Sequence, residues 1–264
     1  ATGIGLLRSE FMFMNRSDLP SEDEQCRVLT KIIEGMDGQP VTIRTLDIGG
    51  DKISTSLLDR FGDSVSSALG LRGIRLSLAH TEVFETQIKA ILRASSAGPV
   101  RILLPMVSAN SEIRKAREIV KLMARKLKRR RIPMARELPP IGVMIEVPAA
   151  ALSADALAQT ADFFAIGSND LTMYTLAIDR SDKQVASLFN PLHPSVLRLI
   201  QFSLQAALRA RIPVSICGEM AGDPNFTALL VGLGFRELSM TAASIPKVKQ
   251  RIRNLDLLAA EARV

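Results

Sequence analysis

The chain of 264 residues is 47% hydrophobic and 4% aromatic, and it carries a formal net charge of +7. This length and apolar content can bury a large core, and they suit one α/β barrel domain over residues 1–264 better than two domains. The absence of Trp and the single Tyr argue against stacking on nucleic-acid bases, and from the sequence we expect neither a signal peptide nor a membrane span. We therefore expect a globular protein with neither nucleic acid nor a membrane as its partner.

The two cysteines suit a protein of the cytoplasm, and the densest basic run allows two interpretations. Cys26 and Cys217 lie in very different sequence contexts, so we expect free thiols in a reducing compartment. The basic run from Arg125 to Arg131 follows a helical stripe of apolar residues, which favours a solvated helix end. A docking surface for an acidic partner stays open as the alternative for this run.

Apolar runs that alternate with amphipathic segments predict eight strands and the helices between them. In chain order the expected strands cover residues 4–7, 41–46, 73–78, 101–106, 141–145, 163–166, 214–216 and 238–240. The expected helices lie near residues 21–34, 81–95, 112–130, 148–159, 194–211, 225–232 and 245–253, and the long loops at 51–69 and 131–140. Eight parallel strands close a barrel, so the predicted fold class is α/β, a single-domain (β/α)8 TIM barrel. Because a strand begins almost at once, we expect the chain to be part of a longer multidomain protein.

Two of the expected strands end abruptly in carboxylates. The segment I-G-V-M-I-E-V-P places Glu146 after the strand at 141–145, and D-F-F-A-I-G-S-N-D places Asp170 after the strand at 163–166. The carboxyl ends of parallel strands are where such folds carry their chemistry. Two carboxylates that face one mouth suit a hard divalent cation such as Mg2+.

Mainly cationic side chains follow the other strands at the same expected end. Arg8 and Glu10 follow the first strand, Arg44 and Asp47 the second, and Arg180 comes a little after the sixth. The region of the third strand carries Arg72 and Arg75, and Cys217-Gly218-Glu219 follows the strand at 214–216. A guanidinium makes paired, charged hydrogen bonds to phosphate and carboxylate groups. Several arginines beside a metal-binding pair of acids predict a small substrate that carries both of these anions.

Five motifs in order make the chain recognisable. They are G-I-G-L-L-R-S-E-F-M-F-M, R-T-L-D-I-G-G-D-K, I-G-V-M-I-E-V-P-A-A, D-F-F-A-I-G-S-N-D-L-T-M-Y-T-L-A-I-D-R and I-C-G-E-M-A-G-D-P. Over essentially its whole length the chain resembles the C-terminal, phosphoenolpyruvate (PEP)-binding barrel of the bacterial phosphoenolpyruvate-protein phosphotransferases, the enzyme I family of the phosphotransferase system. The motif C-G-E-M-A-G-D-P favours this family over the pyruvate phosphate dikinases.

The resemblance implies an enzyme and a role for each matching residue. It implies Mg2+-dependent binding of PEP, with Mn2+ as an alternative ion, and donation of the phosphoryl group to a histidine of a separate N-terminal domain. Pyruvate is released, the phosphoryl group passes on to a histidine phosphocarrier protein in sugar transport, and the barrel forms a homodimer. Glu146 and Asp170 resemble the metal ligands; Arg8, Arg44 and Arg180 the anion clamp; Arg72 a further phosphate-side arginine; Asn169 a substrate ligand; and Cys217 the acid that protonates the enolate.

The chain departs from the family pattern at two places. Leu71 stands where an aromatic residue is usual, and the altered loop at 51–71 leaves the contacts of Lys52 and Arg72 open. Neither His80 nor His193 lies in the T-S-H-x-A-like motif of the phosphoacceptor, so we expect structural roles for both. Two alternatives remain: a fragment of another PEP-utilising enzyme, of the pyruvate phosphate dikinase or PEP synthase type, or a non-catalytic PEP sensor. Whether the chain serves the sugar or the nitrogen branch also stays open.

Overall fold

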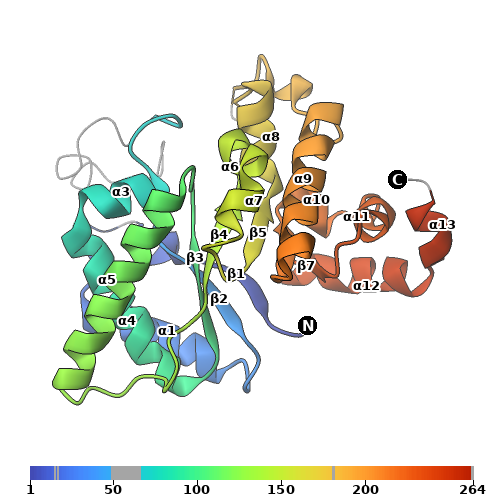
Figure 1. Cartoon of the computed structure of the whole chain (residues 1–264). Coiled ribbons are helices and arrows are strands. Elements are labelled where there is room, and N and C mark those ends of the chain that lie inside the picture. The colour runs from blue at the N-terminus through green and yellow to red at the C-terminus, as the bar shows by residue number, and fades with distance from the viewer. Residues whose placement is uncertain (15, 17, 49–66, 180–181, 263–264) are drawn as a thin grey trace. The chain divides into compact units, whose positions relative to one another are not determined.

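The computed structural model describes residues 1–14, 16, 18–48, 67–179 and 182–262 of the chain (Figure 1). The chain divides into two compact units, Thr2–Gly142 and Val143–Val264, the second of which includes Ala1. Each unit is built from parallel strands that alternate with helices along the chain. Within the described residues, no helix combines the length and the hydropathy of a membrane span.

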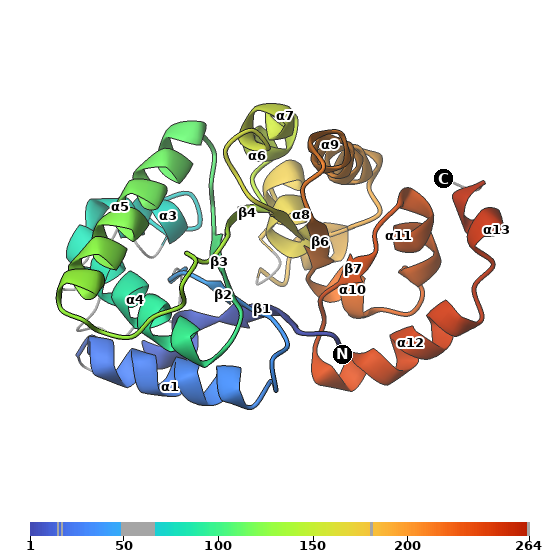
Figure 2. The same ribbon diagram turned by 60° about the horizontal axis from the view of Figure 1, so that its bottom comes forward.

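The unit Thr2–Gly142 contains three parallel strands in chain order, β1 (Ile4–Arg8), β2 (Val41–Arg44) and β3 (Val100–Leu104). Its helices are α1 (Glu22–Glu34), α3 (Gly73–Ala79), α4 (Thr81–Ala94) and α5 (Asn110–Arg129), with 3-10 turns η1 (Ser9–Met12) and η4 (Ser95–Ala97). Helix α1 packs against α4 and α4 against α5, side by side along one face of the strands (Figure 2). The register pairs Arg8 with Arg44, so the carboxyl ends of β1 and β2 are level.

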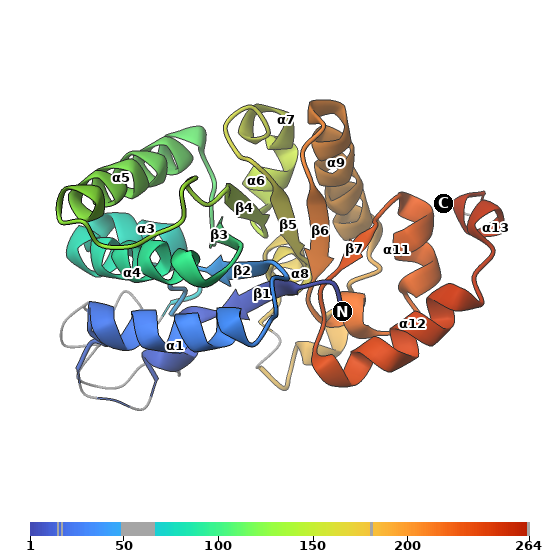
Figure 3. The same cartoon turned by 90° about the horizontal axis from the view of Figure 1, so that it is seen from below.

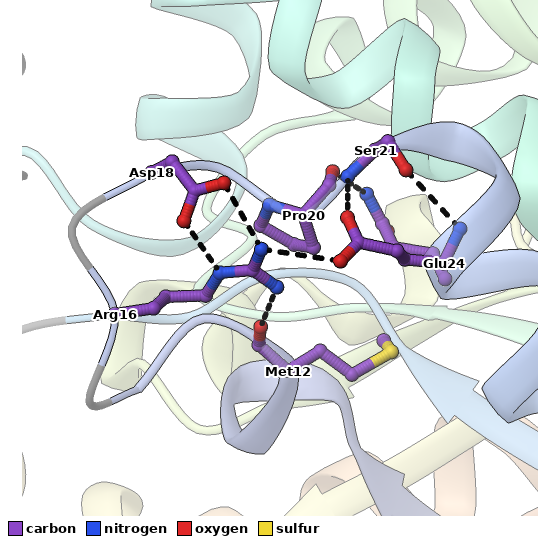
Figure 4. Close-up of polar contacts among 7 residues, drawn as sticks. Met12, Arg16, Asp18, Pro20, Ser21 and Glu24 are labelled. Atoms are coloured by element: carbon purple, nitrogen blue, oxygen red, sulfur yellow. Dashed lines mark hydrogen bonds and ion pairs between the residues drawn. The ribbon is translucent and has the colours of Figure 1, made fainter.

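Helix α1 begins at a pair of reciprocal hydrogen bonds. The backbone N–H of Glu24 donates to Ser21 Oγ at 3.2 Å, and the backbone N–H of Ser21 donates to Glu24 Oε2 at 2.7 Å. The other carboxylate oxygen of Glu24 accepts from Arg16 at 3.3 Å, and Arg16 also pairs with Asp18 (Figure 4). This capping box satisfies two N–H groups that the first turn of a helix otherwise leaves without a partner.

The second unit carries the remaining strands. The division falls in β4 (Ile141–Ile145), which pairs in parallel with β5 (Phe164–Gly167); β5 then pairs with β6 (Val214–Cys217), and β6 with β7 (Glu237–Leu238). The helices and 3-10 turns are α6 (Pro148–Leu152), α7 (Ala154–Leu157), α8 (Ser168–Leu176), η5 (Ala186–Leu188), α9 (Pro194–Ala210), α10 (Glu219–Gly222), α11 (Thr227–Leu233), η6 (Ala242–Ser244), α12 (Ile245–Arg253) and α13 (Leu257–Glu261). Every residue of β4 and β5 is buried, as expected of strands covered on both faces. Near the C-terminus α11 packs against α12 and α13 (Figure 3).

Most of the expected elements are present within a few residues of their predicted ends. Among the described residues, seven of the eight expected strands are observed, and the α/β barrel class is confirmed. The helix expected at 245–253 has those bounds, and residues 131–140 form a loop. The loop expected at 51–69 falls mostly on residues 49–66, outside the described part of the chain. A single domain over residues 1–264 stays a prediction.

The strand expected at residues 73–78 is wrong, because this segment forms helix α3. Its apolar residues alternate with a period of two, but six residues are too few to distinguish a strand from a helix. In α3 the buried Ile74 and Ser77 lie three residues apart, on one helical face. Gly73 has φ +57°, and the N–H of Ile74 donates to the carbonyl of Pro105 at 3.1 Å. A turn that favours glycine and a hydrogen bond to a distant residue therefore start the helix.

Candidate functional site

In the first unit, Arg44 and Arg72 contact two carboxylates that follow β1 and β2. Arg44 at the end of β2 donates from Nη2 to Glu10 Oε1 at 2.7 Å, and its Nη1 lies 3.3 Å from Asp47 Oδ2. Arg72, the N-cap of α3, donates from Nε and Nη2 to the two oxygens of Asp47 at 3.0 and 2.8 Å. Asp47 thus joins two of the arginines that the sequence predicts for the substrate.

The charge of Asp47 depends on these arginines. Its side chain is only 1% exposed. Burial disfavours the charged form, but the charge of Arg44, the hydrogen bonds from Arg72 and the charge of Arg8 together hold the pKa of this carboxyl below its usual range. The group comprises three guanidiniums, those of Arg8, Arg44 and Arg72, and two carboxylates, those of Glu10 and Asp47. In this arginine cluster, defined by these five residues, the guanidiniums are groups that bind phosphate and carboxylate anions.

In the second unit, the two predicted metal ligands lie together. Glu146 follows β4, and Asp170 stands in the first turn of α8, directly after β5. Their carboxylate oxygens approach within 4.8 Å of each other, and Glu146 is 1% exposed. Oxygen ligands of one Mg2+ lie about 2.1 Å from the ion, hence at most about 4.2 Å apart. Two carboxylates this close together suit one hard cation.

Gly167, the last residue of β5, makes the position of Glu146 possible. A Cβ atom at Gly167 would lie 2.9 Å from Glu146 Oε2 and 3.0 Å from Glu146 Cβ, so the side chain of Glu146 would have to shift from its present position. The glycine lets the backbone of β5 pass directly beside the buried carboxylate. In the sequence, Gly167 is the glycine of the A-I-G-S-N-D segment.

Cys217 and Asn169 are held at the ends of neighbouring strands. The register pairs Gly167 of β5 with Cys217 of β6. Ser168 Oγ donates to the carbonyl of Cys217 at 2.8 Å, and the buried thiol of Cys217 lies 3.4 Å from the carbonyl oxygen of Ile166. Asn169 Oδ1 accepts from the backbone N–H of Glu219 at 3.2 Å. These bonds fix the thiol and the amide side chain relative to each other.

The predicted site residues thus fall into two groups, one in each unit. The first unit contains Arg8, Arg44 and Arg72; the second contains Glu146, Asn169, Asp170 and Cys217. Arg180 and Lys52, for which the sequence also suggested roles, lie outside the described residues.

The two histidines lie at helix ends, and neither cysteine is in a disulfide. Both cysteines are free thiols, as expected. His193 is the N-cap of α9, where its Nδ1 accepts from the N–H of Ser195 at 3.3 Å. His80 separates α3 from α4 and lies 3.8 Å from Glu82.

Sequence reasoning missed the part that Glu10 and Asp47 play in the arginine cluster. Both acids follow predicted strands, but the sequence pattern assigns neither of them a role. The available signal was spacing, since Glu10 comes two residues after Arg8 and Asp47 three residues after Arg44. Acids so close to arginines at one edge of a sheet are natural partners for the guanidiniums.

Comparison with known proteins identifies the family. The family described as "PEP-utilising enzyme, PEP-binding domain" matches residues 1–257. The chain is 49% identical to the phosphoenolpyruvate-protein phosphotransferase of Cupriavidus necator over 253 residues. The aligned region covers 96% of this chain and 43% of the relative. It is 42% identical to the protein of that name from Haemophilus influenzae, over 97% of this chain and 44% of the relative. The chain therefore spans less than half the length of these relatives.

Solved structures with similar folds are more distant in sequence. A citrate lyase from Burkholderia xenovorans LB400 matches with a TM-score of 0.55 and 17% identity, over 93% of this chain and 83% of that one. The malate synthase of Haloferax volcanii matches with a TM-score of 0.53 and 14% identity, over 89% of this chain and 59% of that one. These likenesses bear on the fold alone. Because the family match extends over residues 1–257, the chain belongs to the PEP-binding domain family of the PEP-utilising enzymes.

Proposed function

We propose that the chain binds PEP together with Mg2+ and donates its phosphoryl group to a histidine on a separate domain, with release of pyruvate. The observation that carries the proposal is the grouping of Glu146, Asp170, Asn169 and Cys217 at the ends of β4, β5 and β6 in a chain of the PEP-binding family. Carboxylates, an amide and a thiol at one edge of a parallel sheet supply a metal site, a substrate ligand and a proton donor.

The substrate anions are bound by the arginines. PEP carries a phosphate and a carboxylate, and the planar fork of a guanidinium binds either with two hydrogen bonds. The guanidiniums of the arginine cluster, those of Arg8, Arg44 and Arg72, support this role. We assign Arg180 to the same function by its position after β5 and α8 in the sequence.

Glu146 and Asp170 are the residues that would hold the metal. Both offer only oxygen, which suits Mg2+ or Mn2+, and Glu146 is buried where an ion would offset its desolvation. When bound, the ion supplies positive charge at the oxygens of the phosphoryl group, where negative charge develops during transfer.

Cys217 is the proposed proton donor. Transfer breaks the bond between phosphorus and the enol oxygen of PEP and forms a bond between phosphorus and an imidazole nitrogen of the acceptor. The electron pair of the broken bond stays on oxygen as the enolate of pyruvate. The Cys217 thiol then gives its proton to the methylene carbon, which completes pyruvate, and the thiolate regains a proton from solvent.

The acceptor histidine and the wider assembly lie outside this chain. His193 and His80 are held at helix ends, so we assign the acceptor to another domain of a longer cytoplasmic protein. From that histidine the phosphoryl group passes to a histidine phosphocarrier protein, and the barrel, one domain over residues 1–264, forms a homodimer. The names and lengths of the relatives support this assignment.

Calorimetric titration of the chain with PEP tests the proposal. We expect binding in Mg2+ or Mn2+ and a loss of at least about tenfold in affinity in excess chelator, because the arginines alone must compete with the hydration of the anion. Glu146→Ala and Asp170→Ala should weaken binding similarly and abolish the effect of the chelator. Asp155→Ala removes a surface carboxylate that pairs with Arg209 and should bind PEP like the parent. Equal affinity with and without the metal would refute the assignment of the two acids.

A further inference from the structure

We propose that Glu10 is a positioning residue, which fixes the guanidinium of Arg44 and, through Asp47, that of Arg72 before the anionic substrate arrives. The inference rests on the proposed function, because it concerns how that site is prepared. Neither the sequence motifs nor the family match gives Glu10 a role.

One oxygen of Glu10 contacts both the last residue of β2 and the main chain that follows the strand. Oε1 accepts from Arg44 Nη2 at 2.7 Å and from the backbone N–H of Asp47 at 3.2 Å. Glu10 itself lies in the 3-10 turn directly after β1. The carboxylate therefore links the end of β1 to the guanidinium of Arg44 and to the backbone of Asp47, three residues after Arg44.

Asp47 extends this connection to Arg72. It is close to Arg44 at 3.3 Å and accepts two hydrogen bonds from Arg72, whose Nε and Nη2 form a fork on its two oxygens. Two contacts to one guanidinium define the plane of the group as well as its position. The planes of both arginines are thus set by a series of contacts that begins at Glu10.

The Glu10 side chain is 13% exposed, so water competes weakly for these bonds. An arginine side chain loses much rotamer freedom when it binds an anion, and one that is already held in place loses less. The carboxylates reduce the positive charge of the cluster. Because they already order the arginine side chains, less side-chain entropy is lost when the substrate binds. Preorganisation is the advantage that outweighs the lost attraction.

Two substitutions separate the hydrogen bonds of Glu10 from its charge. Glu10→Ala removes both. Glu10→Gln keeps an acceptor at Oε1 and places its amide nitrogen at Oε2, an oxygen that has no hydrogen-bond partner among the described residues. Glu22→Ala is the matched control, since Glu22 accepts from Arg93 at 2.6 Å and pairs with Lys89 at 3.0 Å in the same unit, away from the arginine cluster.

The first measurement is calorimetric PEP affinity in Mg2+ for each folded variant. We expect Glu10→Ala to raise Kd by about tenfold or more, Glu10→Gln to raise it by less, and Glu22→Ala to leave it within about twofold of the parent. A purely structural role for Glu10 would lower the melting temperature of Glu10→Ala and leave its PEP affinity unchanged, as in the Glu22→Ala control, and that result would overturn the inference.

The second measurement does not depend on PEP. The 15N order parameter of the Arg44 Nε–H group, assigned by its loss in Arg44→Lys, should be about 0.85 in the parent and fall below about 0.6 in Glu10→Ala. If the parent fails to bind PEP, the proposed function fails, and this order parameter still decides whether Glu10 positions Arg44. If Glu10→Ala does not fold, Glu10→Gln should show an intermediate order parameter. A rigid Arg44 in every folded Glu10 variant would overturn the inference.

Discussion

Asp47 is the single residue on which the arginine cluster depends most. Its carboxylate is almost fully buried and touches both Arg44 and Arg72. An ion buried without a partner costs several kcal/mol, and here the arginines offset that cost for Asp47 as Asp47 does for them. Removal of the Asp47 carboxylate takes one negatively charged partner from each of two largely buried guanidiniums, those of Arg44 and Arg72.

We predict that Asp47→Asn lowers the free energy of unfolding by about 3–5 kcal/mol at neutral pH, as breaking a buried ion pair does. The pKa of Asp47 is lower in the folded chain than its ordinary value of 3.8. The stabilisation is therefore complete above about pH 4 and is lost as the pH falls through the folded value. Urea denaturation at a series of pH values should show parent and variant converging in acid. A gap that stayed constant down to about pH 2 would contradict this role of the charge.

At the scale of elements, the first turn of α1 depends on Ser21. Its side chain and that of Glu24 each accept from the backbone N–H of the other residue (Figure 4). We predict that Ser21→Ala destabilises the chain by about 1 kcal/mol, the usual effect of losing an N-cap. The exposed Ser111 of α5 offers a control, whose replacement by Ala should change stability by less than about 0.5 kcal/mol. Thermal unfolding followed by circular dichroism measures both, and equal effects would show that the cap contributes nothing.

The turn between β6 and α10 is a second element whose geometry requires one residue type. Gly218 has φ +101°, and a Cβ there would lie 2.5 Å from Ser168 Oγ and 2.9 Å from Asn169 Oδ1. We predict that Gly218→Ala displaces both side chains and weakens PEP binding by at least about tenfold, because a substrate ligand moves.

The variant Gly38→Ala separates the effect of backbone strain from the effect of displacing Asn169. Gly38 also has a positive φ, +78°, but nothing lies within 4 Å of the added Cβ. It should lose about 1 kcal/mol of stability from backbone strain and bind PEP like the parent. Comparable losses of PEP affinity in the two variants, measured by calorimetry, would rule out the close approach to Asn169 as the cause.

At the scale of the whole molecule, the chain corresponds to less than half of its relatives. We predict that labelled PEP with Mg2+ leaves no stable phosphate on this chain, and that a histidine-bearing domain added in trans accepts it at a reduced rate, since tethering is absent. In that mixture Cys217→Ala should bind PEP normally but slow pyruvate formation by about 100-fold or more. Cys26→Ala, which changes a half-buried thiol of α1, should not slow it. Pyruvate formation at the parent rate in Cys217→Ala would assign the proton to another donor.

The predicted elements agree with the structure where all residues of a segment share one kind of environment. Strands β4 and β5 are buried from end to end, so their apolar runs are continuous, and α12 has an apolar stripe of helical period with a proline in its first turn. The helix expected at 148–159 is instead divided at Ser153 into α6 and α7. Ser153 Oγ donates to the carbonyl of Ala149 at 2.7 Å, and such local side-chain bonds compete with a continuous helix.

By itself the sequence determined the alternation of strands and helices, the placement of Glu146 and Asp170 after successive strands, and the position of Arg8 and Arg44 at strand ends. These features follow from local patterns, because hydrophobic period and chain order are properties of neighbouring residues. Only the tertiary structure decided that residues 73–78 are helical, that Gly167 lies against Glu146, and that Glu10 and Asp47 hold the arginines. Each of these depends on a contact between residues far apart in the chain, such as Ile74 with Pro105 or Arg72 with Asp47, whose distance and direction no local pattern contains.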